Sequence, residues 1–148
     1  MADAAAATAA ACDADNPLLQ PLGVAAYDRV RPEHVVPALS HLLEAAELAL
    51  EQAVAQELPA DYDNLSRLLD VPIERLGRAW SAVSHLNEVA DSPELRTAYS
   101  ELLPRVTDFH TQLGADQRLY RKYRQIAAGD HGSARQRALQ HTLRDFVL

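Results

Sequence analysis

The stretch HVVPALSHLLEAAELALEQAV, residues 34–54, determines the fold class of this chain. Its apolar side chains recur at steps of three, four or one residue, which places them on one stripe of an α-helix. Pro32 fits the first turn of this helix, whereas Pro37 removes a backbone donor five residues later, so the helix starts with an irregular turn or begins at Pro37. The stripe consists of Val35, Leu39, Leu42, Leu43, Ala46, Leu50 and Val54.

Two further long helices follow in the sequence. Asp61 is a suitable N-cap for the second, and the apolar stripe of that helix keeps its phase across Pro72, which favours one kinked helix over two separate ones. Ser92 is a suitable N-cap for the third, with Pro93 at its first position and Gly114 at its end. Both segments therefore predict helices long enough to form a bundle with the first.

Two shorter helices complete the prediction. One runs from about Asp116 to Ala128, and the other begins at Ser133, where Gln136 three residues later completes a capping box. This last helix is expected to bury Leu139, Leu143 and Phe146. Residues 16–31 contain two prolines and a glycine without a sustained period, which predicts an extended arm anchored by Leu18, Leu19 and Leu22. The expected fold is all-α, with about five antiparallel helices and an extended N-terminal arm.

Length and composition agree with one helical domain. The 148 residues include 48% hydrophobic side chains and only five glycines, which favours helices over strands. The 21 acidic and 14 basic side chains give a net charge of −7, which disfavours a nucleic-acid partner. No apolar run approaches the roughly 20 residues that a transmembrane helix needs, so we expect no membrane association.

The first fifteen residues, MADAAAATAAACDAD, have a composition of their own. No Lys or Arg precedes the alanine run, so the segment lacks the positive region of a secretory signal, and we expect a disordered tail. Cys12 is the single cysteine of the sequence and has no second cysteine to pair with, which fits a reducing compartment. These features together predict a cytoplasmic protein.

The six histidines do not form a metal motif, since none belongs to an HExxH sequence. His34 and His41 are seven residues apart, but no further ligand lies one turn between them, which favours a solvated helix face. His131 follows Asp130 in a loop and is expected to make a local turn contact. His85 lies beside an apolar stripe, which predicts a buried or half-buried imidazole hydrogen-bonded between helices. Phosphotransfer by His85 is the bolder alternative, and the LNEV sequence that follows it disfavours that role.

The tract RLYRKYR, residues 118–124, interleaves aromatic and basic residues, a pattern typical of nucleic-acid binding. On a helical wheel the apolar and aromatic positions share one side and the basic ones point elsewhere: Leu119, Tyr120, Tyr123 and Ile126 against Arg118, Arg121 and Lys122. The tract is therefore interpreted as a core face and a solvated face.

Carboxylates are scattered over helix starts and exposed positions, and those of the first helix form a solvated ridge of Glu44, Glu47 and Glu51. Such a ridge nominates no general acid–base pair. The sequence also contains no Gly-rich phosphate loop, no GxSxG motif and no CxxC motif. We therefore predict no catalytic, cofactor-binding or metal-binding residue in this chain.

Several blocks of sequence nevertheless follow a known order: NPLL from residue 16, PEHVVPA at 32–38, SHLNEVADSPELRTAY at 84–99, LYRKYRQIAAGDH at 119–131 and ALQHTLRDF at 138–146. In this series the chain resembles the N-terminal region of the oligopeptidase A branch of the thimet-oligopeptidase family of zinc metallopeptidases. The resemblance implies large, mostly helical enzymes with a deep channel that admits short unfolded peptides.

In enzymes of that family, as the resemblance implies, two histidines and a glutamate bind Zn²⁺ and the motif glutamate is the general base. Those residues lie far toward the C-terminus of the family pattern and have no counterpart here. Residues 16–148 are therefore expected to form part of the channel wall, truncated before the catalytic domain. The chain alone is expected to be inactive and to hold no cofactor, with the rest of the parent peptidase and short peptides as partners.

A stand-alone helical protein-interaction module without enzymatic activity is the alternative function. The last helix ends in RDFVL without a glycine or proline stop signal. If the chain is a fragment of a larger body, apolar surface should be exposed around Phe146 to Leu148. An independent module should instead be monodisperse and unfold cooperatively.

Overall fold

The computed structural model describes residues 15–20, 26–129 and 131–147. Most of these residues belong to five α-helices: α2 (Pro32–Val54), α3 (Tyr62–Val89), α4 (Pro93–Ala115), α5 (Gln117–Ala127) and α6 (Ser133–Arg144). The described residues contain no strand, and the predicted all-α class is confirmed. The predicted tail, residues 1–15, lies outside the described residues apart from Asp15.

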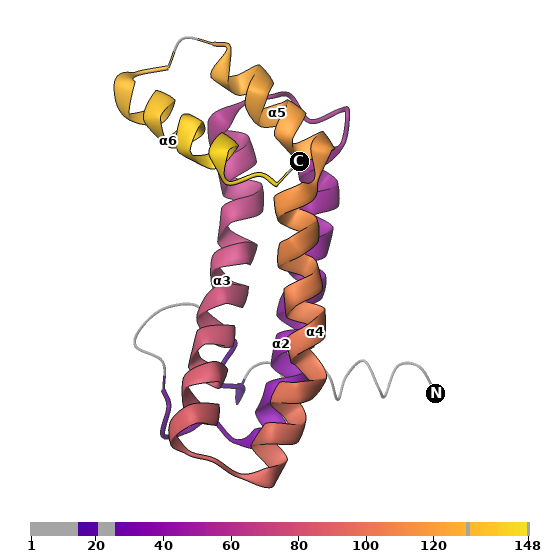
Figure 1. The fold of residues 1–148 in the computed structure, drawn as a ribbon, viewed down its shortest axis with the longest axis vertical. Helices are drawn as coiled ribbons and strands as arrows, with labels where there is room; N and C mark the ends of the chain where they lie inside the picture. The colour runs from indigo at the N-terminus through magenta and orange to yellow at the C-terminus, as the bar shows by residue number, and fades with distance from the viewer. Residues whose placement is uncertain (1–14, 21–25, 130, 148) are drawn as a thin grey trace.

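The three long helices form an elongated bundle, and α5 and α6 lie across one end of it (Figure 1). The chain runs along the bundle in α2, returns in α3 and runs forward again in α4. Helix α2 contacts both α3 and α4 extensively, whereas α3 and α4 share few contacts with each other. Helix α2 is therefore the central element of the fold.

The burial of α2 explains this central position. Its predicted apolar stripe is confirmed, because Val35, Leu39 and Leu43 are each at most 1% exposed. Alanines at positions 38, 46 and 53 are fully buried as well, and their small side chains let neighbouring helices approach closely. Each fully buried leucine or valine contributes about 1.5–3 kcal/mol relative to an exposed one, so α2 supplies much of the stability of the core.

The beginning of α2 resolves the alternatives that its two prolines left open. The helix begins at Pro32 and continues through Pro37. The backbone nitrogen of Arg31 donates to Nδ1 of His34 at 3.1 Å, which satisfies one donor at the helix start. Pro32 at the first helical position needs no such partner because it has no N–H group.

The predicted caps of the other two long helices are confirmed. The Oδ1 atom of Asp61 accepts a hydrogen bond from the Asn64 amide at 2.9 Å, and α3 continues through Pro72 as one helix. Oγ of Ser92 accepts from the Leu95 amide at 3.1 Å. Helix α4 passes through Gly114 and ends one residue later.

The predicted capping box of α6 is wrong. Gly132 occupies the N-cap position, and no side chain caps the helix there. Gln136 donates instead to the carbonyl of Ala127 at 3.1 Å, because the last carbonyls of α5 lack partners within their own helix. Of the three side chains expected in the core from this end of the chain, Leu139 is buried, while Leu143 and Phe146 are half-buried.

The arm is attached to the bundle by polar as well as apolar contacts. Leu18 and Leu19 are buried as predicted, and Leu22 lies outside the described residues. Nδ2 of Asn16 donates to the His34 carbonyl at 2.9 Å, and Arg75 of α3 donates to the Leu19 carbonyl at 3.2 Å. The Leu19 amide closes a turn onto the Asn16 carbonyl at 3.0 Å, so this part of the arm is folded back rather than extended.

Candidate functional site

The histidines lie in different parts of the fold, and His131 and His141 each make a local contact. His131 contacts the Ile126 carbonyl through Nε2, which agrees with the predicted turn contact. His141 lies 3.1 Å from Asp145, one turn further along the chain. Within residues 15–20, 26–129 and 131–147, no group of three or more His, Cys, Asp or Glu side chains could hold a metal ion.

The prediction for His85 is wrong. The side chain is exposed on α3, and its ring lies edge-on to the ring of Tyr27 at a centroid distance of 5.4 Å. The stripe of α3 packs on α2 through its buried positions, among them Val83, and His85 lies on the outer side of that stripe. The position of His85 on the helical wheel could not show that its imidazole lies at the surface, beside Tyr27 of the N-terminal arm.

A polar junction joins α5 to the end of α2, and we take it as the candidate functional site. Only Asp116 separates α4 from α5, and its Oδ1 atom accepts hydrogen bonds from the amides of Arg118 at 2.7 Å and Leu119 at 3.1 Å. Asp116 is thus the N-cap of α5. A carboxylate at this position also interacts favourably with the helix dipole.

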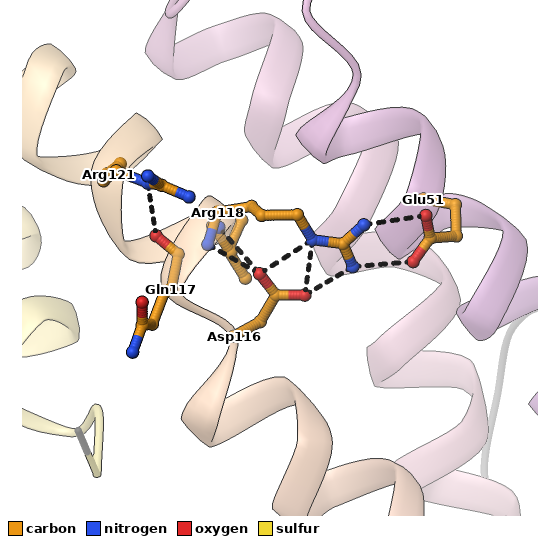
Figure 2. A network of polar contacts seen from close by, with 6 residues as sticks. Glu51, Asp116, Gln117, Arg118 and Arg121 are labelled. Carbon is orange, nitrogen blue, oxygen red and sulfur yellow. Dashed lines mark hydrogen bonds and ion pairs between the residues drawn. The ribbon is translucent and has the colours of Figure 1, made fainter.

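The Arg118 guanidinium lies between two carboxylates, that of Glu51 on α2 and that of Asp116 at the start of α5 (Figure 2). Its two terminal nitrogens donate to Glu51 of α2 at 3.0 and 2.8 Å, which is a bidentate contact. The same Nη2 atom donates to Oδ2 of Asp116 at 2.7 Å. Glu51, which the sequence placed in a solvated ridge, therefore has a specific partner.

The junction shifts the ionisation of all three groups toward their charged forms. The side-chain hydrogen bond from Arg118 lowers the pKa of Glu51. Partial burial alone would raise the pKa of Asp116, but hydrogen bonds from the Arg118 side chain and from the Leu119 and Arg118 amides outweigh it, so this pKa is lowered. The hydrogen bonds to Glu51 and Asp116 raise the pKa of Arg118 above its ordinary value.

Lys122 provides a second connection between α5 and the end of α2. Its side chain is only 9% exposed, and Nζ donates to the carbonyls of Ala55 at 2.6 Å and Leu58 at 2.5 Å. Burial lowers the pKa of Lys122. The interpretation of this lysine as part of a solvated face is wrong, because the linker after α2 covers it.

Arg118 and Lys122 together fix the direction in which α5 leaves the bundle. Both cations bind groups at the C-terminal end of α2, where a positive charge interacts favourably with the helix dipole. Every charged group of the junction has an opposite charge or a carbonyl as partner. These contacts are those of a structural connection between α2 and α5.

Comparison with known proteins extends this description. Residues 36–148, which include nearly all of α2 and the whole of α3 to α6, match the family model "Neurolysin/Thimet oligopeptidase, N-terminal domain". The chain belongs to this oligopeptidase family. The resemblance drawn from the ordered sequence blocks is thereby confirmed.

Relatives in this family are similar to the chain over most of its length. Oligopeptidase A of Escherichia coli (strain K12) is 41% identical over 137 residues, which are 90% of this chain and 20% of that protein. The corresponding proteins of Salmonella typhimurium and Haemophilus influenzae are 39% and 36% identical, with the same coverage. The chain thus spans about a fifth of the length of these relatives.

The family model covers the bundle together with the α5–α6 end, so the polar junction lies inside the matched region. No helix in the described residues combines the length and the hydropathy that crossing a bilayer requires. The sequence prediction of no catalytic, cofactor-binding or metal-binding residue stays a prediction.

Proposed function

We propose that this chain is the non-catalytic N-terminal helical part of a zinc metallo-oligopeptidase that hydrolyses short peptides. The match of residues 36–148 to the N-terminal domain of the neurolysin/thimet oligopeptidase family carries this proposal. The similar proteins named oligopeptidase A support it, since their similarity to the chain extends over 90% of its residues. In this role the helices form part of the wall of the substrate channel.

The zinc ion of the intact enzyme would be bound by residues outside this chain. The sequence has no HExxH motif, and the part described by the structure offers no cluster of ligands that fits the ion. The partners of the chain are accordingly the rest of the parent peptidase and, in the intact enzyme, short peptides. The compartment that we propose is the cytoplasm, which the single unpaired cysteine supports.

The polar junction and the core of α2 suit a wall element. A channel wall has to keep its shape while peptides enter and leave, and buried apolar contacts between helices provide such rigidity. Arg118 and Lys122 add fixed hydrogen bonds where the chain changes direction between the bundle and α5. The contribution of this chain to catalysis is therefore one of shape and support.

A chimeric enzyme tests the proposal. Residues 16–148 replace the aligned segment of E. coli oligopeptidase A, and cleavage of a short quenched peptide is measured before and after removal of zinc with a chelator. We expect the chimera to cleave the peptide in a zinc-dependent manner. The same enzyme with the segment deleted, and the 148-residue chain alone, should be inactive.

Two results would refute the proposal. The first is chelator-sensitive turnover by the isolated chain that added zinc restores. The second is a chimera that binds one zinc ion and has native helix content by circular dichroism, yet is as inactive as the deletion variant.

The alternative is a stand-alone helical interaction module without enzymatic activity. The packing of Phe146 favours it. The Phe146 ring lies 5.4 Å from the ring of Tyr120 and 6.1 Å from that of Tyr123, measured between centroids, so part of the apolar surface around Phe146 is covered. Val147 beside it is 79% exposed, which favours the larger enzyme instead. Light scattering during size-exclusion chromatography distinguishes them, because a module should be monodisperse and a wall element should self-associate.

A further inference from the structure

An apolar hollow of about 220 Å³ lies where α3, α4, α5 and the segment after α6 meet. Its walls are formed by Leu69, Ile73, Leu113, Leu119, Tyr123 and Phe146. It is separate from the polar junction, since neither Glu51 nor Arg118 lines it. Its lining residues place it at the end of the bundle that α5 and α6 cross. Figure 1 shows this arrangement of the helices.

The hollow has a buried floor and an exposed rim. Leu69 and Leu119 are each 2% exposed, so the floor is buried and apolar. Asp70, His110 and Asp145 also line the hollow, and all three are exposed, so the rim faces solvent. An engineered apolar cavity of about 150 Å³ in another protein holds benzene, so this volume accommodates one ring or one branched aliphatic chain.

The rim is acidic. Asp70 comes from α3 and Asp145 from the segment after α6, so the carboxylates approach the hollow from two elements. The rim carries these two carboxylates and the imidazole of His110. Burial, and then the charge of Asp70, raise the pKa of Tyr123 to about 12, which agrees with a negative potential near the phenol. Asp70 accepts a hydrogen bond from Ser66, and Asp145 contacts His141.

We propose that this hollow binds a small apolar compound that carries an ammonium group. The apolar part contacts the floor at Leu69 and Leu119, and the ammonium lies at the rim between Asp70 and Asp145. The carboxylates repel an anionic compound of the same shape, and a neutral one gains no charge-assisted hydrogen bond. Free amines and the N-terminal residue of a peptide share this chemistry. The proposal is independent of the proposed function.

The first experiment compares matched ligands by NMR chemical-shift titration of the 148-residue chain. We expect saturable shifts with phenethylamine at amides that line the hollow, such as those of Ile73 and Tyr123. 2-Phenylethanol should bind about fivefold more weakly, since an exposed charge pair contributes up to about 1 kcal/mol, and phenylacetate should not bind. Tighter binding of phenylalaninamide than of phenethylamine assigns the site to a peptide N-terminus, and the reverse order assigns it to a free amine.

Variants test the two parts of the site separately. Asp70→Asn removes one of the two carboxylates and should weaken phenethylamine about twofold while leaving 2-phenylethanol unchanged. Ile73→Trp should fill the hollow and abolish binding of both. Glu101→Gln removes the same charge from an exposed position of α4 outside the hollow and should change neither affinity. Circular dichroism melting shows that each variant is folded.

Three results would overturn the proposal. These are an absence of saturable shifts with phenethylamine, binding of phenylacetate as tight as that of phenethylamine, and equal effects of Asp70→Asn and Glu101→Gln. The Ile73→Trp variant adds a further check, because unchanged binding in a folded variant would show that the ligand sits elsewhere.

Discussion

Asp116 has two roles at a single position of the chain. Its carboxylate caps the first turn of α5 through the Arg118 and Leu119 amides, and it also contacts the Arg118 side chain that reaches Glu51. The first role needs only a hydrogen-bond acceptor, whereas the second needs a negative charge. A substitution that keeps the acceptor and removes the charge can therefore separate them.

Asp116→Asn should have this effect, because asparagine is as good an N-cap as aspartate. The pKa of Asp116 is lowered from its unfolded value of 3.8, so the charged carboxylate stabilises the fold fully at pH values above 3.8. This stabilisation is lost as the pH falls through the lower pKa of the folded state. We expect the variant to be less stable at pH 7 by at most about 1 kcal/mol, since solvent screens the half-exposed Arg118. The difference from the natural chain should narrow below about pH 4. Urea unfolding at a series of pH values measures it, and a difference that stays constant would contradict the charge role.

Lys122 shows where prediction from single residues ends. A helical wheel records which positions share a face, and it correctly put Leu119 and Ile126 in the core. It could not show that the carbonyls of Ala55 and Leu58, which precede Lys122 by more than sixty residues, lie over the same helix. One feature of the sequence could have indicated that this position is special, because Lys122 is the single lysine beside thirteen arginines.

At the level of the helices, local signals were reliable when their partners were local. Asp61 and Ser92 cap amides only three residues away, and both were predicted. Gln136 makes a contact with Ala127 of another helix, and there the predicted capping box failed. The residue pattern at Ser133 fits a capping box as well as those at Asp61 and Ser92 fit an N-cap. The prediction failed at Ser133 because Gln136 has its partner in another helix.

Paired substitutions test this distinction. Ser92→Ala removes the acceptor for the Leu95 amide and should cost about 1 kcal/mol of stability. Ser133→Ala is the matched control, since no side chain caps α6, and its effect should stay within about 0.5 kcal/mol. Chemical unfolding of both variants provides the comparison. Equal losses would show that Ser133 caps α6 in solution.

In the whole molecule, stability is distributed unevenly along the chain. Helix α2 contributes nine buried side chains and contacts three other helices, whereas α6 contributes Leu139 and packs chiefly on α5. The sequence predicted the five helices of the described residues and the all-α class from periodicity. It could not predict that α2 is central or that α3 and α4 share few contacts, because several helices carry comparable stripes.

Hydrogen exchange should reveal this difference in stability between α2 and α6. We expect the amides of α2 to exchange only through global unfolding, and those of α6 to exchange through local opening with a smaller free energy. Mass spectrometry of peptides from residues 38–50 and 136–144 measures both. Protection of α6 equal to that of α2 would show that the end of the molecule opens together with the bundle.

The buried position of Lys122 also has a practical consequence. Acylating reagents attack side-chain amines in their uncharged form. Lys122 has the one side-chain amine in this sequence, and its Nζ atom donates to two carbonyls beneath the α2–α3 linker. Its labelling rate therefore reports how often α5 lifts away from the bundle, which gives a built-in chemical probe of that motion without any engineered tag.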